Sequence, residues 1–273
     1  MSIEGAAGGR LGVDASLVRR LLDTQCPQWA QLPLKLLEPA GSDHVIYRLG
    51  DELSVRLPRR PGHNVGLCKE SVWLPQLAPH LPLDIPVQLF VGEPDFGFPF
   101  LSSVARWLPG TVATSVEGLG DSTEAAHDVA GFLAALQQFK AIDLPPGDIT
   151  EDLLTERPIG DRDLATRIAV AQVSHVFPTA AMTDLWDAAL SAPDWDSPPV
   201  WFHGDFHAGN LLTTDGRISA VIDFGALGIG DPACDVAGVF GLLSARNGIP
   251  SGGRSTSTTP PGHAPAAWRW LMA

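Results

Sequence analysis

A short polar string near the C-terminal end of the chain does most to limit the folds that this sequence can adopt. It reads HGDFHAGN over residues 203–210 and is followed by IDFG over residues 222–225. Its glycines and the preceding run PPVWF argue against a helix, because glycine weakens helices while aromatic and β-branched residues favour strands. We therefore expect a loop between short strands that presents Asp205, Asn210 and Asp223.

The two histidines of the string first suggest a metal site. His203 and His207 are four positions apart, as in the zinc motif H-E-x-x-H, but Gly204 replaces the glutamate and no helix is expected to bring the rings together. An iron(II) site formed by His203, Asp205 and a distant histidine usually lies on a β-barrel, for which the chain has too few predicted strands. A metallohydrolase or oxygenase is thus a minor alternative, as is a loop that these groups only hold by hydrogen bonding.

Phosphoryl transfer accounts for more of the string. That reaction needs an aspartate beside the attacking hydroxyl and two oxygen ligands for a Mg²⁺ ion on the nucleotide phosphates. Protein kinases supply these groups from a loop H-R-D-x-x-x-x-N and from a D-F-G segment. Asp205, Asn210 and Asp223 occur in the same order, with the same interval of five between the first two. A hairpin turn predicted at Asp215-Gly216 would fold Asp223 back beside Asn210.

A second part of such a site is expected upstream. The segment LSVRLP places Arg56 where the kinase pattern V-A-I-K has its lysine, and KESVWL offers Glu70 on the following predicted helix. Arginine keeps the positive charge and can bind phosphate oxygens with two N–H groups, although its geometry differs from that of lysine. The sequence therefore predicts that Arg56 and Glu70 act together at the nucleotide phosphates.

Elements of two kinds are predicted along the chain. A helix is expected at 16–25, with Ser16 as its N-cap. Short strand-like runs separated by turn residues predict a small antiparallel sheet of about five strands. One helix at 64–79 interrupts these strands, and Pro75 is expected to bend or end it. From 122–142 onwards the apolar spacing is mainly helical, before strands return around the polar string.

This pattern predicts an α+β protein-kinase-like fold of two lobes. A small N-terminal lobe of antiparallel sheet with one helix would bind the nucleotide, and a larger, mainly helical lobe would hold the catalytic residues and the acceptor. The predicted parts are the N-terminal lobe (1–106), the C-terminal lobe (107–246) and a low-complexity tail rich in Gly, Pro, Ser and Thr (247–273).

The charge balance narrows the partners. The chain has 31 acidic and 18 basic residues, a formal net charge of −13. Nucleic acid and anionic membranes need basic patches, so neither is an expected partner, whereas a cationic small molecule would suit this balance. The three scattered cysteines, together with the absence of a signal-peptide or membrane-span pattern, predict a cytoplasmic protein.

These residues resemble the aminoglycoside phosphotransferase family, the antibiotic-kinase branch of the protein-kinase-like fold. HGDFHAGNLL is similar to that family's loop H-G-D-x-x-x-x-N, and VIDFGALGIGDPACDVA (221–237) to its metal-binding segment. EPAGSDHVIYRLGDELSVRLPRR looks like the first three strands of a subfamily with arginine at the phosphate-contact position. The resemblance covers roughly residues 30–240.

The resemblance implies a role for each matching position. Asp205 would be the base or the residue that orients the acceptor hydroxyl, and His203 and Asp235 would hold the loop by hydrogen bonds. The remaining implied roles are Mg²⁺ ligands (Asn210, Asp223), a phosphate contact and the residue that orients it (Arg56, Glu70), a loop over the phosphates (Gly41, Ser42, Asp43, His44) and a hinge that reads adenine through its backbone (103–107, with Ala105 at its centre).

The expected function is ATP-dependent transfer of the γ-phosphate to a hydroxyl of an aminoglycoside-like antibiotic or a small metabolite, with Mg²⁺ and a role in antibiotic resistance. The sequence leaves open the acceptor, GTP in place of ATP and the oligomeric state. Past the D-P-x-x-D segment the chain departs from the family and turns into the low-complexity tail, as a truncated or frame-shifted chain would. The alternative is therefore a non-catalytic nucleotide-binding module with an incomplete C-terminal lobe.

Overall fold

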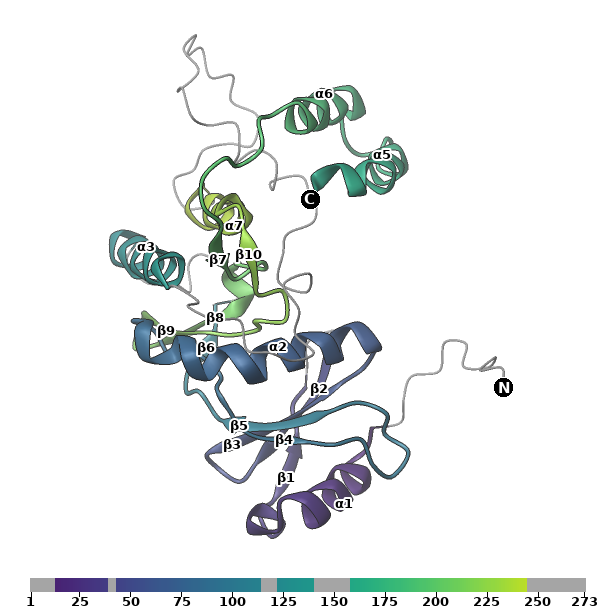
Figure 1. The fold of residues 1–273 in the computed structure, drawn as a ribbon, viewed down its shortest axis with the longest axis vertical. Coiled ribbons are helices and arrows are strands. Elements are labelled where there is room, and N and C mark those ends of the chain that lie inside the picture. The colour runs from purple at the N-terminus through teal and green to yellow at the C-terminus, as the bar shows by residue number, and fades with distance from the viewer. Residues whose placement is uncertain (1–12, 39–42, 114–121, 140–157, 245–273) are drawn as a thin grey trace, which may run out of the picture. The chain divides into compact units, whose positions relative to one another are not determined.

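The computed structural model describes residues 13–38, 43–113, 122–139 and 158–244 (Figure 1). The chain divides into two compact units. Unit 1 comprises residues 1–79 and 84–109, and unit 2 comprises residues 80–83 and 110–273. The division falls inside the segment WLPG, at which the sequence changes from strand-like to helical patterns.

Unit 1 is built on a five-stranded antiparallel sheet with the strand order β1-β2-β3-β5-β4, as the alternating runs and turn residues predict. The central strand β3 has β2 on one side and β5 on the other, which explains why all six of its residues are buried. The elements of unit 1 are α1 (Ala15–Gln25), β1 (Leu34–Leu36), β2 (His44–Leu49), β3 (Leu53–Pro58), α2 (Pro61–Leu77), β4 (Gln88–Gly92) and β5 (Ser102–Arg106).

The ends of the two helices differ from the sequence prediction. Asp14, and not Ser16, caps α1: its Oδ1 accepts the Leu17 N–H at 2.8 Å and the Ser16 hydroxyl hydrogen at 2.8 Å. The Leu17 N–H, followed by the Ser16 hydroxyl, lowers the pKa of the Asp14 carboxyl. The helix α2 runs through Pro75 to Leu77, so Pro75 does not end it. A proline in the last turn removes one backbone donor, and little of the helix remains to be disrupted.

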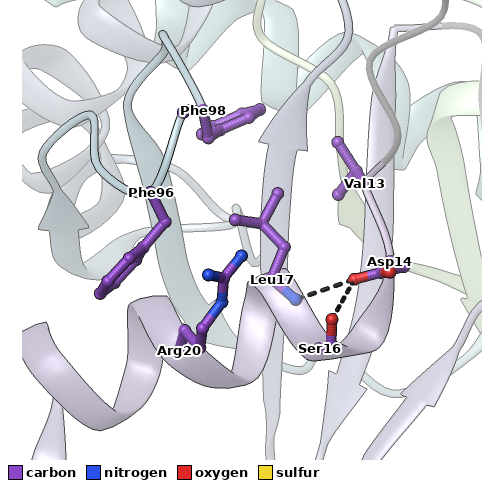
Figure 2. A pocket seen from close by; sticks show the side chains of 8 residues that line it. Val13, Asp14, Ser16, Leu17, Arg20, Phe96 and Phe98 are labelled. Carbon is purple, nitrogen blue, oxygen red and sulfur yellow. Dashed lines mark hydrogen bonds between the residues drawn. The ribbon is translucent and has the colours of Figure 1, made fainter.

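The core of unit 1 joins α1 to the sheet. Leu17, Val18, Leu21 and Leu22 have the helical spacing of one buried face, and they belong to the same hydrophobic cluster as the buried residues of β2 and β3. An open hollow of about 210 Å³ lies beside the start of α1, where the guanidinium of Arg20 faces a phenylalanine ring (Figure 2). None of the predicted site residues lines this hollow.

Unit 2 combines helices with two small antiparallel sheets, one with the order β6-β8-β9 and one that pairs β10 with β7. Asp215 and Gly216 have φ angles of 52° and 78°, which fits the two-residue turn predicted between β8 and β9. The elements are β6 (Thr111–Val112), α3 (Ser122–Gln138), α5 (Asp163–Gln172), α6 (Thr179–Leu190), β7 (Val200–Phe202), the 3₁₀ turn η5 (Ala208–Asn210), β8 (Leu211–Thr214), β9 (Arg217–Val221), β10 (Gly228–Gly230) and α7 (Ala233–Ser244).

The helices α5 and α6 pack as a pair within unit 2. The indole Nε1 of Trp186 donates to Asp163 at 2.6 Å, and Arg167 forms ion pairs with Asp163 and Asp187. No helix in the described part of the chain has the length and hydropathy of a membrane span. The predicted tail from residue 247 onwards lies outside the described residues.

Candidate active site

The polar string forms a compact loop in unit 2, between β7 and β8. The side-chain amide of Asn210 donates to the backbone oxygen of Asp205 at 2.9 Å and to its carboxylate Oδ2 at 3.1 Å. Asn210 is buried, whereas the Asp205 side chain is 56% exposed. The five-residue interval therefore closes the loop on itself, and the carboxylate that the sequence singled out lies at the surface of the unit.

The hairpin of β8 and β9 brings Asp223 to the same loop. Leu211 pairs with Val221 across the two strands, and the backbone N–H of Ile222 donates to the backbone oxygen of Asn210 at 2.9 Å. Asp223 follows directly, with a left-handed φ of 66°. A residue with a Cβ adopts this conformation at a cost of roughly 1–2 kcal/mol, although aspartate tolerates it better than most. The predicted return of Asp223 to Asn210 is confirmed.

His203 and Asp235 hold the loop from behind. Asp235 is fully buried and accepts the backbone N–H groups of His203 and Gly204, each at 2.8 Å. Burial raises the pKa of the Asp235 carboxyl to about 6, and these two N–H groups act in the opposite direction. The interpretation of both residues as bracing groups is confirmed by these contacts.

The ring of His203 uses both of its nitrogens in the brace. Nε2 donates to the backbone oxygen of Ile222 at 3.0 Å, and Nδ1 accepts the backbone N–H of Asp205 at 3.2 Å. Burial lowers the pKa of His203 to about 4, so the ring is neutral near pH 7. The ring therefore has no nitrogen left for zinc or iron, which removes the basis of both metal interpretations.

Gly204 is required by the shape of this loop. Its φ of 85° lies in the region that favours glycine, and a Cβ would collide with the backbone oxygen of Ala226. Aromatic rings support the loop from within unit 2: the centroid of Phe224 lies 4.5 Å from that of His203, and the ring of Phe206 stacks on Phe132 of α3. The glycine of the H-G-D motif is thus required because no side chain fits beside Ala226.

In unit 1, Arg56 on β3 and Glu70 on α2 form the predicted pair. Arg56 Nη1 lies 2.7 Å from Oε2 of Glu70, and Nη2 lies 3.4 Å from Oε1. The two side chains are 10% and 1% exposed. The amide of Gln88 on β4 donates to the same Oε2 at 3.0 Å. No sequence signal indicated Gln88, because its approach depends on the packing of α2 against β4.

His44, at the start of β2, also contacts this pair. Its Nδ1 lies 3.5 Å from Nη2 of Arg56, and a guanidinium can only donate, so Nδ1 acts as the acceptor and Nε2 carries the hydrogen. Burial, followed by the charge of Arg56, lowers the pKa of His44 to about 2. Nε2 is buried and has no hydrogen-bond partner among the described residues. From the sequence, His44 was expected only as the last residue of the loop over the phosphates.

The other predicted nucleotide contacts are Gly41, Ser42 and Ala105. Gly41 and Ser42 lie outside the described residues. Ala105 is a buried residue inside β5, opposite Ser54 of β3 and Gln88 of β4, so strands flank its backbone on both sides. The chain leaves the sheet only after Arg106, which ends β5.

The donors of the loop fit a magnesium ion better than a transition metal. Among the described residues, no cluster of three His, Cys, Asp or Glu side chains forms a protein-only cage. Asn210 donates to Asp205 through its amide nitrogen, so its Oδ1 can act as a metal ligand, and Asp223 adds a carboxylate. Magnesium is usually held by one or two such oxygen ligands together with substrate phosphates. Asn210 and Asp223 are therefore the residues that would hold it.

Solved structures share this fold at low sequence identity. The GDP and kanamycin complex of APH(2″)-IIIa matches with a TM-score of 0.66 and 20% identity, over 83% of this chain and 78% of that one. A macrolide 2′-phosphotransferase of type I matches at 0.60 and 20% identity, over 97% and 90%. The apoenzyme of macrolide 2′-phosphotransferase MphH from Brachybacterium faecium matches at 0.55 and 22% identity, over 94% and 86%.

The fold and the loop thus define a kinase-like phosphotransferase, and the predicted α+β fold of two lobes is confirmed. The model of the phosphotransferase enzyme family matches residues 36–254, so the chain belongs to that family. A search of curated proteins found no match. The resemblance to antibiotic phosphotransferases is confirmed by the family and by these structures.

Proposed function

We propose that this phosphotransferase moves the γ-phosphate of ATP to a hydroxyl group of a small molecule. The observation that carries the proposal is the single assembly formed by the Asn210 amide, the exposed Asp205 carboxylate and the returning Asp223. Unit 1 would bind the nucleotide, and unit 2 would supply the catalytic residues and the acceptor site. Use of ATP places the proposed reaction in the cytoplasm.

In the proposed reaction Asp205 orients the acceptor hydroxyl and takes its proton. The hydroxyl oxygen forms a bond to the γ-phosphorus while the bond to the β,γ-bridging oxygen breaks, and ADP leaves. Asp205 suits this role because its carboxylate is exposed and Asn210 fixes its orientation. A bound Mg²⁺ ion would neutralise charge on the phosphate oxygens.

Arg56 is proposed to contact the nucleotide phosphates. Its guanidinium lies 2.7 Å from the carboxylate of Glu70, and both groups are buried. This contact fixes the direction of the guanidinium N–H groups before a ligand binds. A preorganised cation of this kind loses little side-chain entropy on binding. Glu70 is accordingly proposed as the residue that orients Arg56.

The acceptor is proposed to be a cationic small molecule such as an aminoglycoside, whose phosphorylation would give antibiotic resistance. Two observations support this class. The chain carries a formal net charge of −13, which favours encounter with cations. The similar structures include a complex with kanamycin and a complex with gentamicin.

The proposal is tested by transfer of the γ-phosphate from ATP or GTP to kanamycin, gentamicin, streptomycin and a macrolide. Replacing Asp205 by Asn is expected to lower turnover roughly 100-fold or more, the range of a lost general base. Asp215→Asn is the matched control, because Asp215 is an exposed turn residue with a φ of 52°, which Asn accepts. Binding of Mg-ATP without turnover on any acceptor would support the non-catalytic module, and full activity of Asp205→Asn would refute the mechanism.

A further inference from the structure

His207 is a polar side chain of the loop that has no part in the proposed reaction or in the brace formed by His203 and Asp235. It is the N-cap of the 3₁₀ turn η5, where its Nδ1 accepts the backbone N–H of Gly209 at 3.0 Å. Because Nδ1 accepts, the ring hydrogen lies on Nε2 in the neutral form. This orientation belongs to the neutral ring, because an imidazolium carries a hydrogen on Nδ1 as well and cannot accept the Gly209 N–H.

That Nε2 faces the proposed catalytic residue. It lies 3.5 Å from Oδ2 of Asp205, the same oxygen that accepts the Asn210 amide at 3.1 Å. A separation of 3.5 Å is longer than a good hydrogen bond, but contacts of this kind often shorten when a substrate binds. The Asn210 amide therefore binds Oδ2, the Nε2 of His207 lies near the same oxygen, and Oδ1 is left for an acceptor hydroxyl.

Gly209 makes room for the imidazole. A Cβ on Gly209 would lie 2.7 Å from Cε1 and 2.9 Å from Nδ1 of His207, both closer than real contacts allow. The φ of Gly209 is not in the left-handed region, so its backbone does not itself require glycine. The glycine at position 209 thus leaves the space in which the ring lies with its Nε2 near Asp205.

We propose that His207 is a positioning residue for Asp205: seated against Gly209, it holds Oδ2 through Nε2–H so that Oδ1 points to the acceptor. The proposal rests on the role of Asp205 given under the proposed function. His207 and Asp205 are both about half exposed, so water competes for the contact and its expected contribution is small.

Three variants separate this role from simple bracing of the loop. His207→Asn keeps an oxygen near the position of Nδ1 and so retains the cap, but it cannot reach Asp205. His207→Gln places an amide N–H near the position of Nε2 and keeps that reach. Gly209→Ala keeps the imidazole of His207, but the added Cβ of the alanine would displace that ring from its position.

The readout is ADP release from Mg-ATP, with kanamycin as acceptor and with water alone, together with thermal unfolding. We expect His207→Asn and Gly209→Ala each to lower kcat roughly fivefold with an unchanged KM for Mg-ATP and an unchanged Tm, and His207→Gln to recover most of that loss. A double variant that combines His207→Asn with Gly209→Ala should be no slower than either single one, because both changes remove the same contact.

Several results would overturn the inference. They are full kcat in His207→Asn, no recovery in His207→Gln, or additive losses in the double variant. A loss of Tm that parallels the loss of kcat would assign His207 to bracing alone. An active Asp205→Asn would instead remove the proposed function itself, and the two failures are therefore distinguishable.

Discussion

Replacing Glu70 by Gln is expected to destabilise unit 1 and to weaken nucleotide binding together. Oε2 of Glu70 accepts hydrogen bonds from Nη1 of Arg56 at 2.7 Å and from the amide of Gln88 at 3.0 Å, while Oε1 lies 3.4 Å from Nη2 of Arg56. A glutamine has only one oxygen. Its NH₂ group would therefore face another donor, and the guanidinium would remain buried without its counter-charge.

The magnitude follows from the burial of the pair. The two side chains are 10% and 1% exposed, so solvent screens their interaction little. Removing one partner of a buried pair leaves an uncompensated charge and typically costs about 3–5 kcal/mol. Because the introduced glutamine would still accept one hydrogen bond from Arg56, we expect a loss of about 3 kcal/mol in the free energy of unfolding of unit 1, at the lower end of that range.

The assay is hydrogen exchange of peptides from β3 and α2, which reports the opening free energy of unit 1 by itself. Calorimetric titration with Mg-ATP gives the affinity. As a control, Arg56→Met combined with Glu70→Leu replaces the pair by apolar side chains and should recover stability to within about 1 kcal/mol. It should not recover nucleotide binding. A loss below about 1 kcal/mol in Glu70→Gln, or restored binding in the double variant, would refute the reasoning.

Two further predictions concern buried groups. Asp235→Ala removes the acceptor of two backbone N–H groups and should destabilise unit 2 by about 3 kcal/mol, measured by exchange of peptides that contain His203, whereas an unchanged exchange rate would contradict the bracing role. In unit 1 the folded pKa of His44 is lowered from 6.5 to about 2. Below about pH 6.5, His44 therefore binds a proton in the unfolded chain but stays neutral in the folded chain. The contribution of neutral His44 to the free energy of unfolding is fully present above that pH and should fall by about 1.4 kcal/mol per pH unit as the pH drops towards about 5. His44→Asn should remove this pH dependence, as measured by urea titrations.

Much of the fold was predictable because local chemistry specifies it. The runs around Val45 and Val55 are rich in residues that favour strands, and the turn at Asp215-Gly216 has the residues that a two-residue hairpin requires. Where the sequence prediction failed, two local signals competed. Asp14 and Ser16 are both good caps, and the carboxylate at Asp14 accepts the Leu17 N–H because it is the stronger acceptor at a helix N-terminus.

The order of charged and polar residues along the chain indicated the family and the residues of the candidate site, since Asp205, Asn210 and Asp223 have the order of the kinase catalytic loop and D-F-G segment. The tertiary structure decided how these groups are supported. The family resemblance named Asp235 as a brace, but the two backbone N–H groups that its carboxylate accepts are fixed by the fold. Gln88 reaches Glu70 because α2 packs against β4. Such contacts depend on packing between distant segments, which no local pattern encodes.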